Sequence, residues 1–166
     1  MDVMMGMRDL LYSEQRLDEA REGAGGAPEG VAESDRVLGV VTELGIGGGV
    51  AIAAGFANGD ARLFFSSGGG LIGDLSQFPG IDRAARALVA TGQLMLDAIP
   101  EAEGNDLPGQ DMVRFALLTP GGIHAATAPG PEVTSPGSPL YPLFVAANDL
   151  LTELRLVEEQ TRQRGT

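Results

Sequence analysis

The chain has 166 residues, a formal net charge of −12 and no cysteine. This length fits one domain, the missing cysteines exclude disulfides, thiolate metal sites and cysteine nucleophiles, and the acidic balance argues against a nucleic-acid partner. All 11 positive charges are arginines, which excludes a Walker-type phosphate-binding lysine and a Schiff-base lysine.

No stretch of the sequence approaches the roughly 20 uninterrupted apolar residues that a membrane span requires. The first residues, Met1 to Asp9, carry no basic segment ahead of an apolar run and no cleavage signature. We therefore expect a cytoplasmic protein with no membrane partner.

Residues 4–22 favour a helix that ends at Gly23. Its apolar stripe is narrow, so two arrangements stay open: the helix packs onto a sheet, or it is partly exposed and a second subunit covers it. Residues 23–33 are rich in Gly, Ala, Pro and Glu, which is typical of a flexible linker.

Three strands are predicted next, over residues 36–44, 50–56 and 60–66. The first of them could also be a helix that Ser34 caps. Asn58 and Gly59 favour a type I′ turn between the second and third strands, because this pair tolerates positive φ at both central positions. The three strands form an antiparallel meander that leads into a run of glycines.

That run contains the most unusual chemistry in the chain. Gly68, Gly70 and Gly73 fit the G-x-G-x-x-G spacing that lets a backbone approach a phosphate at a helix N-terminus. Pro79 follows too soon for the long helix of a dinucleotide fold, so a tight strand-to-helix connection is the alternative. The candidate ligand-binding residues are Ser66, Ser67, Gly68, Gly69, Gly70 and Gly73.

The second half of the chain is predicted to contain a helix, two strands and a final helix. A helix is predicted over residues 81–99, a surface loop over 101–110, a hairpin of strands 112–119 and 122–127 around Pro120-Gly121, and a final helix over 140–162. Residues 128–139 are rich in Pro, Gly and Ser and are expected to form either a mobile lid or a packed Ω-type loop.

This order predicts an α+β fold of one domain, residues 1–166, in which an antiparallel five-stranded sheet, a meander plus a hairpin, carries its helices mainly on one face. In element order it resembles the small sandwiches of the roadblock, longin and profilin kind. That resemblance implies a dimerisation or regulatory module.

A closer resemblance lies in residues 37–73. The core Phe65-Ser66-Ser67-Gly68-Gly69-Gly70-Leu71-Ile72-Gly73 is similar to an F-S-x-G-G-G-x-I-G pattern of an uncharacterised bacterial family. The pattern covers about a quarter of the chain, and the resemblance implies no activity and no catalytic residue.

The titratable residues indicate no catalytic or metal site. His124, the single histidine, would need a serine such as Ser66, Ser67 or Ser135 and an orienting carboxylate nearby, and a strand residue with a hydrogen-bonded ring is the alternative. Glu101, Glu103 and Asp106 cluster without the spacing of a calcium loop. We predict no cofactor, no metal and no catalytic residue, and whether the chain is an enzyme stays uncertain, leaning to no.

Three functions are compatible with these features. The leading hypothesis is a non-enzymatic cytoplasmic module that self-associates or binds another protein. The second is a small-molecule or anion binder, or an enzyme, that uses the backbone amides of residues 68–73. The third is an acidic immunity-type protein that neutralises a basic toxin, for which the charge is the supporting feature.

Overall fold

The computed structural model describes residues 2–71 and 74–164. Within these residues the chain forms one antiparallel sheet of six strands in the order β4-β3-β2-β1-β5-β6. The strands are β1 (Gly39–Ile46), β2 (Gly49–Phe56), β3 (Ala61–Phe65), β4 (Gly70–Leu71), β5 (Met112–Thr119) and β6 (Gly122–Pro129). The helices are α1 (Asp2–Leu11), α2 (Glu14–Arg21), α3 (Pro79–Met95), α4 (Gly130–Val133) and α5 (Tyr141–Arg164), with 3₁₀ turns η1 (Glu33–Asp35), η2 (Leu75–Gln77) and η3 (Leu96–Ala98).

The predicted α+β class, the antiparallel sheet, the meander and the second hairpin are confirmed, and the predicted number of five strands is wrong. The additional strand is β4, in which Gly70 and Leu71 pair with Phe64 and Leu63. The two hairpins join through β1 and β5, where Val41 pairs with Ala116. The predicted strand over 36–44 is therefore central in the sheet rather than a helix.

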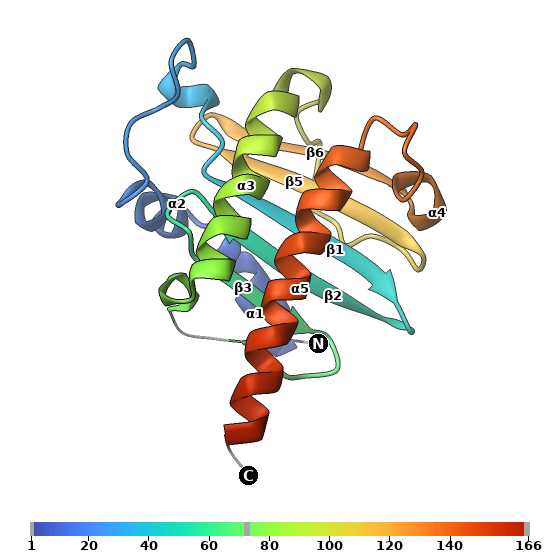
Figure 1. Ribbon diagram of the computed structural model, residues 1–166. Coiled ribbons are helices and arrows are strands. Elements are labelled where there is room, and N and C mark those ends of the chain that lie inside the picture. The colour runs from blue at the N-terminus through green and yellow to red at the C-terminus, as the bar shows by residue number, and fades with distance from the viewer. Residues whose placement is uncertain (1, 72–73, 165–166) are drawn as a thin grey trace.

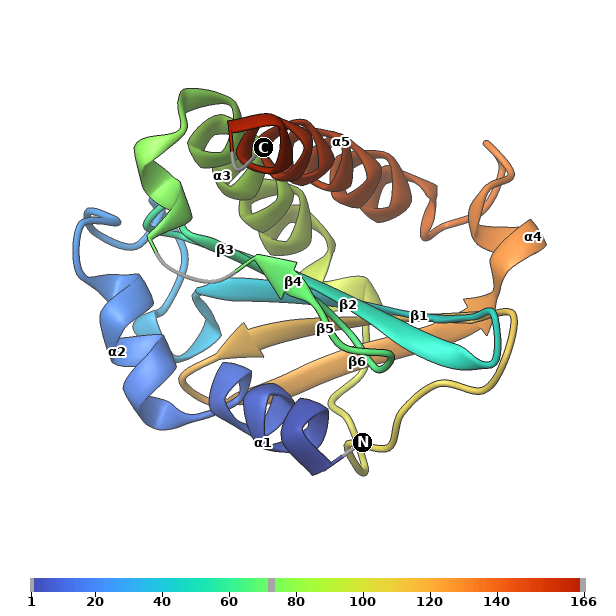
Figure 2. The same cartoon turned by 90° about the horizontal axis from the view of Figure 1, so that it is seen from below.

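Helices cover both faces of the sheet. Figure 1 shows α3 and α5 side by side across one face, and Figure 2 shows α1 and α2 beneath the other. We expected the helices mainly on one face. The two long helices α3 and α5 do share one face, but α1 and α2 cover the other. A strand with both faces covered must be apolar on both, and this explains why β1 and β2 have nearly continuous apolar sequences.

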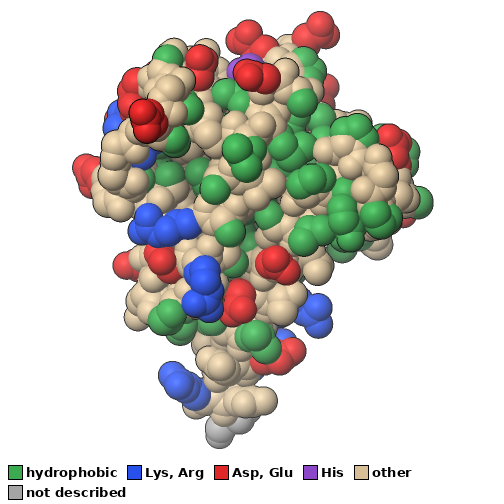
Figure 3. All heavy atoms as spheres, turned by 45° about the horizontal axis from the view of Figure 1, so that its top comes forward, with side chains coloured by type: hydrophobic (Ala, Val, Ile, Leu, Met, Phe, Trp, Pro, Cys, Tyr) green, Lys and Arg blue, Asp and Glu red, His purple; other side chains and the backbone are tan. Residues whose placement is uncertain are grey.

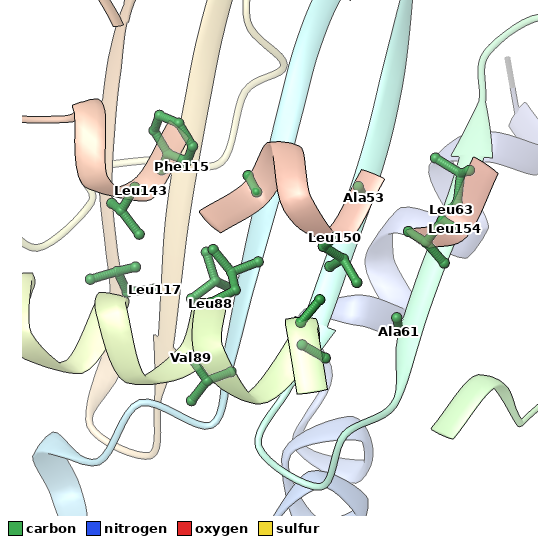
Figure 4. Close-up of a cluster of buried hydrophobic side chains, with 14 of the residues drawn as sticks. Ala53, Ala61, Leu63, Leu88, Val89, Phe115, Leu117, Leu143, Leu150 and Leu154 are labelled. Atoms are coloured by element: carbon green, nitrogen blue, oxygen red, sulfur yellow. The ribbon is translucent and has the colours of Figure 1, made fainter. Parts of the chain in front are cut away.

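The larger core lies between the sheet and the pair α3 and α5. Leu88 of α3 and Leu150 of α5 lie against the strands that carry Leu117 and Ala53 (Figure 4), and all four side chains are buried. Buried residues of α5 recur at helical spacing, as in Leu143, Ala147 and Leu150, and buried residues of β5 alternate, as in Phe115 and Leu117, so the two periodicities meet across one interface. This core fixes α3 and α5 on the sheet.

The predicted N-terminal helix over 4–22 is two helices. The chain turns at Tyr12, and the Ser13 hydroxyl accepts the backbone N–H of Arg16 at 3.2 Å as the N-cap of α2. The apolar side of α1 packs onto the sheet, where Met4 and Leu11 are buried. Of the two arrangements left open by its narrow stripe, packing on the sheet is therefore the one that the structure has.

Two further connections differ from the sequence predictions. Between β2 and β3 only Gly59 has positive φ, at +87°, so the loop is a type I turn followed by a left-handed glycine rather than a type I′ turn. Residues 128–139 contain the short helix α4, whose Val133 is fully buried. Ala128 and Val133 anchor this segment on the core, while most of its other residues are exposed.

The predicted linker lies between α2 and η1, where Arg36 donates hydrogen bonds to the carbonyl groups of Ala24 and Gly25. In the part of the chain that the structure describes, no helix combines the length and apolar character needed to cross a membrane.

Candidate functional site

The glycine loop, residues 66–73, begins as the turn of a short hairpin. The Gly68 N–H donates to the Phe65 carbonyl at 3.0 Å, and the Phe65 N–H donates to the Gly69 carbonyl at 3.3 Å. Strand β4 and the 3₁₀ turn η2 then separate the glycines from α3. The glycines form a tight turn, but it connects two strands, so the predicted tight strand-to-helix connection is wrong. The helix N-terminus that a phosphate cradle would use is not adjacent to this turn.

The conformation of this turn explains its glycines without a ligand. Gly68 and Gly69 have φ of +98° and +83°, values that residues with a Cβ rarely adopt. At Gly70 an added Cβ would lie 2.2 Å from the Leu63 carbonyl oxygen, so only glycine fits against β3. Each glycine of the triplet thus has a structural reason.

Four of the six predicted ligand-binding residues lie together. Ser66, Ser67, Gly68 and Gly69 line one side of a pocket of about 280 Å³, and Met4 and Met7 of α1 line the other. Gly70 belongs to β4, where it pairs with Phe64, and Gly73 lies outside the described residues. The Ser66 hydroxyl already accepts the Val50 N–H at 2.8 Å, which ties the loop to β2.

The electrostatics of this pocket do not favour an anion. No arginine is among the described residues that line it, so a bound anion would meet backbone amides, serine hydroxyl groups and the apolar side chains of methionine and phenylalanine, with no positive charge. Charge neutralisation is the main source of affinity for phosphate groups. Ligand binding by the glycine loop stays a hypothesis, and its geometry supports a structural role.

The other sequence candidates are distributed around the molecule. His124 lies in β6 with Nδ1 2.9 Å from the Ile99 carbonyl, and the strand order puts β5, β1 and β2 between it and the strand that leads to Ser66. Four strand spacings of about 4.8 Å separate them by roughly 19 Å. Among the described residues, no three His, Asp or Glu side chains are grouped to hold a metal ion.

Sequence reasoning missed a buried charge cluster, defined here as Arg8, Tyr12, Glu43 and Arg114. The Arg8 guanidinium binds Glu43 through two hydrogen bonds, Nε to Oε2 and Nη2 to Oε1, the latter at 2.9 Å. Arg114 Nη1 lies 3.1 Å from both Glu43 Oε1 and the Tyr12 hydroxyl. These four residues join α1 to the centre of the sheet.

The electrostatics of the charge cluster indicate a structural role. Burial works to lower the pKa of Arg8, but the hydrogen bond and charge of Glu43 raise it above its usual value. Burial, with the charge of Glu43, raises the pKa of Tyr12 to about 12, too high for a base at neutral pH. Glu43 is fully buried and accepts three hydrogen bonds, so no substrate reaches its carboxylate.

A second feature that sequence reasoning missed is an open groove of about 670 Å³ between the outer sides of α3 and α5, called here the helix-face groove. Its apolar part includes Ala87, Pro142 and Val145, and its polar part includes Arg83, Asp149 and Glu153. Val145 is 38% exposed, and Leu94, on the last turn of α3, is 88% exposed. Figure 3 shows hydrophobic side chains across the centre of the surface and a band of mixed charges below them.

The charged side chains of the helix-face groove form no ion pairs among the described residues. Among the described residues, neither Arg83 nor Asp149 nor Glu153 takes part in an ion pair. No local sequence pattern marked this groove, because its lining comes from two helices that are far apart in the chain. For the charge cluster, the signal was Glu43 and Arg114 inside apolar strands.

Comparison of the chain with protein-family models, with curated proteins and with solved structures finds no match. The resemblance in element order to roadblock-like proteins and the resemblance of the glycine pattern to a bacterial family therefore stay predictions from the sequence.

Proposed function

We propose that this protein is an interaction module that associates with a second copy of itself through the helix-face groove. The observation that carries the proposal is the coexistence, on one exposed face, of apolar side chains and unpaired charges of both signs. A two-fold interface uses the same patch on both partners, so a patch that joins its own copy must be complementary to itself.

The antiparallel arrangement of α3 and α5 supports this complementarity. An added Cβ at Gly80 would lie 2.2 Å from a carboxylate oxygen of Glu153, so the start of α3 lies beside the middle of α5. A two-fold axis along the groove lays α3 of one copy on α5 of the other. Arg83 of each copy then lies at the level of Asp149 and Glu153 of its partner, and the apolar parts of the two grooves meet.

Sedimentation velocity over a range of protein concentrations tests the proposal. We expect a dimer, and we expect Val145→Asp to shift the equilibrium to monomer because it buries a carboxylate in the apolar part of the interface. Leu10→Asp is the matched control, since Leu10 is 63% exposed on α1, against the opposite face of the sheet. This variant should leave the dimer unchanged.

A charge reversal tests the orientation. Arg83→Glu should weaken the dimer about tenfold or more, and adding Asp149→Arg to it should restore much of the loss, because the pair then attracts with its signs exchanged. A wild-type protein that stays monomeric up to about 0.1 mM would contradict the proposal. A dimer with a dissociation constant above that value would be too weak to count as specific self-association.

A further inference from the structure

A second groove lies at the end of the sheet that α3 and α5 leave uncovered. This end groove has a volume of about 610 Å³ and is bounded by the last residues of β1, the first of β5, α4 and the start of α5. Figure 1 shows the hairpin of β1 and β2 extending past α5 at this end. Leu44, Ile46, Met112, Val133 and Phe144 provide its apolar lining.

The apolar lining is exposed for a reason that lies in the strand pattern. Leu44 and Ile46 alternate with Gly45, so both project toward the side of the sheet that carries α5. Leu44 packs at the margin of the core, whereas Ile46, two residues closer to the hairpin tip, is 54% exposed. The floor of the end groove is therefore an extension of the core for which this chain supplies no covering helix.

Hydrogen bonds of the backbone and of the Gln110 side chain hold the rim of the end groove in place. The Asp111 N–H donates to the Gly45 carbonyl and the Asp111 carbonyl accepts the Gly130 N–H, both at 2.7 Å. The Gln110 amide bridges the hairpin tip, accepting from the Gly48 N–H at 2.9 Å and donating to the Gly49 carbonyl at 3.0 Å. A rim fixed in this way loses little conformational entropy when a partner binds.

The charge of the rim selects the partner. Asp111 is the sole charged residue among the described residues that line the end groove, and this exposed residue takes part in no ion pair within the described ranges. Its φ of +64° is the one positive value among described residues other than glycine. The chain as a whole carries a net charge of −12, so its field attracts a basic partner.

We propose that the end groove binds an amphipathic, basic helix of another protein. The apolar side of that helix packs on Leu44, Ile46 and Phe144, and a lysine or arginine on its flank pairs with Asp111. Such a helix would lie beside α5 and continue the helix layer over the uncovered strands, which is the helix-in-groove mode of peptide recognition. This binding site is separate from the helix-face groove and does not depend on self-association.

Two designed peptides and fluorescence anisotropy with the full chain test this proposal. The first is a peptide of about 14 residues, roughly four helical turns, with leucines on one side and lysines on the other. The second has glutamate at every lysine position. We expect the lysine peptide to bind and the glutamate peptide to bind at least about tenfold more weakly.

Variants then locate the binding site. Ile46→Ser and Asp111→Asn should each weaken binding of the lysine peptide about five- to tenfold, because one removes buried apolar area and the other the opposing charge. Asparagine tolerates positive φ, so Asp111→Asn preserves the rim. The matched controls are Leu10→Ser and Asp97→Asn, an exposed apolar and an exposed acidic residue that lie outside the lining of the end groove, and each should change affinity less than about twofold.

Several results would overturn the proposal. Equal losses at the end groove and at the control positions would mean that the peptide binds the acidic surface without a site. Equal affinity of the two peptides, or no binding of either up to about 1 mM, would exclude a basic helix as the occupant. If Ile46→Ser dissociates a dimer and leaves peptide affinity unchanged, the occupant is a second copy of the chain.

Discussion

Glu43 of β1 and Arg114 of β5 are directly paired residues of antiparallel strands, with Arg114 Nη1 3.1 Å from Glu43 Oε1 and both side chains buried. Arg8 approaches the same carboxylate from α1. One negative charge therefore compensates two buried guanidinium groups. Through them Glu43 links β1 to β5 and holds α1 on the sheet.

Replacing Glu43 by glutamine should be the most damaging conservative change on this face of the sheet. It leaves two buried cations without a counter-charge, and breaking a buried ion pair typically costs about 3–5 kcal/mol. We expect the free energy of unfolding, measured by urea denaturation, to fall by that amount. Asp82→Asn, which breaks the exposed pair of Asp82 with Arg86, should change it by less than about 0.5 kcal/mol.

A triple variant separates the role of the charge from the role of packing. Exchanging all three charged residues for apolar ones, Arg8→Met, Glu43→Leu and Arg114→Met, removes the need for compensation and should lose much less stability than Glu43→Gln alone. A triple variant less stable than Glu43→Gln would show that the hydrogen bonds of the cluster contribute more than the cost of burying its charges.

The buried charge cluster also predicts a pH dependence through Tyr12. The pKa of this phenol is raised from 10.0 to about 12, first by burial and then by the charge of Glu43. Between these values the unfolded chain loses the proton and the folded chain keeps it, so the folded state is disfavoured as the pH rises. The contribution of Tyr12 to stability is fully present below pH 10 and is lost by about pH 12.

The measurement is the unfolding free energy at a series of alkaline pH values, together with the ultraviolet absorbance of tyrosinate in the folded protein. The wild type should show a steeper loss of stability in this window than Tyr12→Phe, which has no phenol to ionise at that position. Identical slopes for the two proteins would refute the shifted pKa of Tyr12.

The sequence determines the strands more clearly than it determines the contacts between layers. The strands of the meander were predictable because Asn58 and Gly59 mark a turn between apolar runs. Strand β4 was not, since Gly70 and Leu71 alone give no alternating pattern. The cluster of Arg8, Glu43 and Arg114 was beyond reach because it joins residues 35 and 71 positions apart, and the order of the strands decides which charges meet.

For the candidate sites the sequence was informative about composition and silent about surfaces. Triple glycine in residues 68–70 drew attention because glycine spacing is a known local signal, yet the structure accounts for each glycine by backbone conformation. The helix-face groove is built from residues of α3 and α5 whose sequences are about 60 positions apart, such as Ala87 and Val145. No local pattern marks such a groove.

Gly70 and Gly6 predict opposite effects of the same substitution. At Gly70 alanine must take φ of +145° with its Cβ 2.2 Å from the Leu63 carbonyl, which should lower stability by at least about 2 kcal/mol and open the hairpin of β3 and β4. Gly6 is exposed within α1 with no atom near an added Cβ, so alanine should raise stability by about 0.5–1 kcal/mol.

Thermal and urea unfolding of the two alanine variants measure these changes. A Gly70→Ala protein as stable as the wild type would show that the tight approach of β4 to β3 is wrong. Gly69→Ala has open space around its Cβ but is strained at φ of +83°, so neither alanine variant by itself tests ligand binding at the glycine loop.

Thr42 and Thr119 are both buried threonines of the sheet and differ in the bonding of their hydroxyl groups. Among the described residues the Thr42 hydroxyl has no hydrogen-bond partner, whereas the Thr119 hydroxyl donates to the Gly122 carbonyl at 2.8 Å and accepts the Gly122 N–H at 3.1 Å. A buried hydroxyl without a partner costs about 1–3 kcal/mol. Valine has nearly the same shape as threonine and carries no polar group.

We therefore expect Thr42→Val to raise the free energy of unfolding by about 1 kcal/mol and Thr119→Val to lower it by about 1–2 kcal/mol. Urea denaturation of the two variants under the same conditions gives both values. Thr42 lies on β1 beneath α3 and α5, between Val40 and Leu44, so valine there extends an apolar surface that already exists. A destabilised Thr42→Val protein would mean that a buried water satisfies this hydroxyl, because removing its partner would then leave that water with an unmade hydrogen bond.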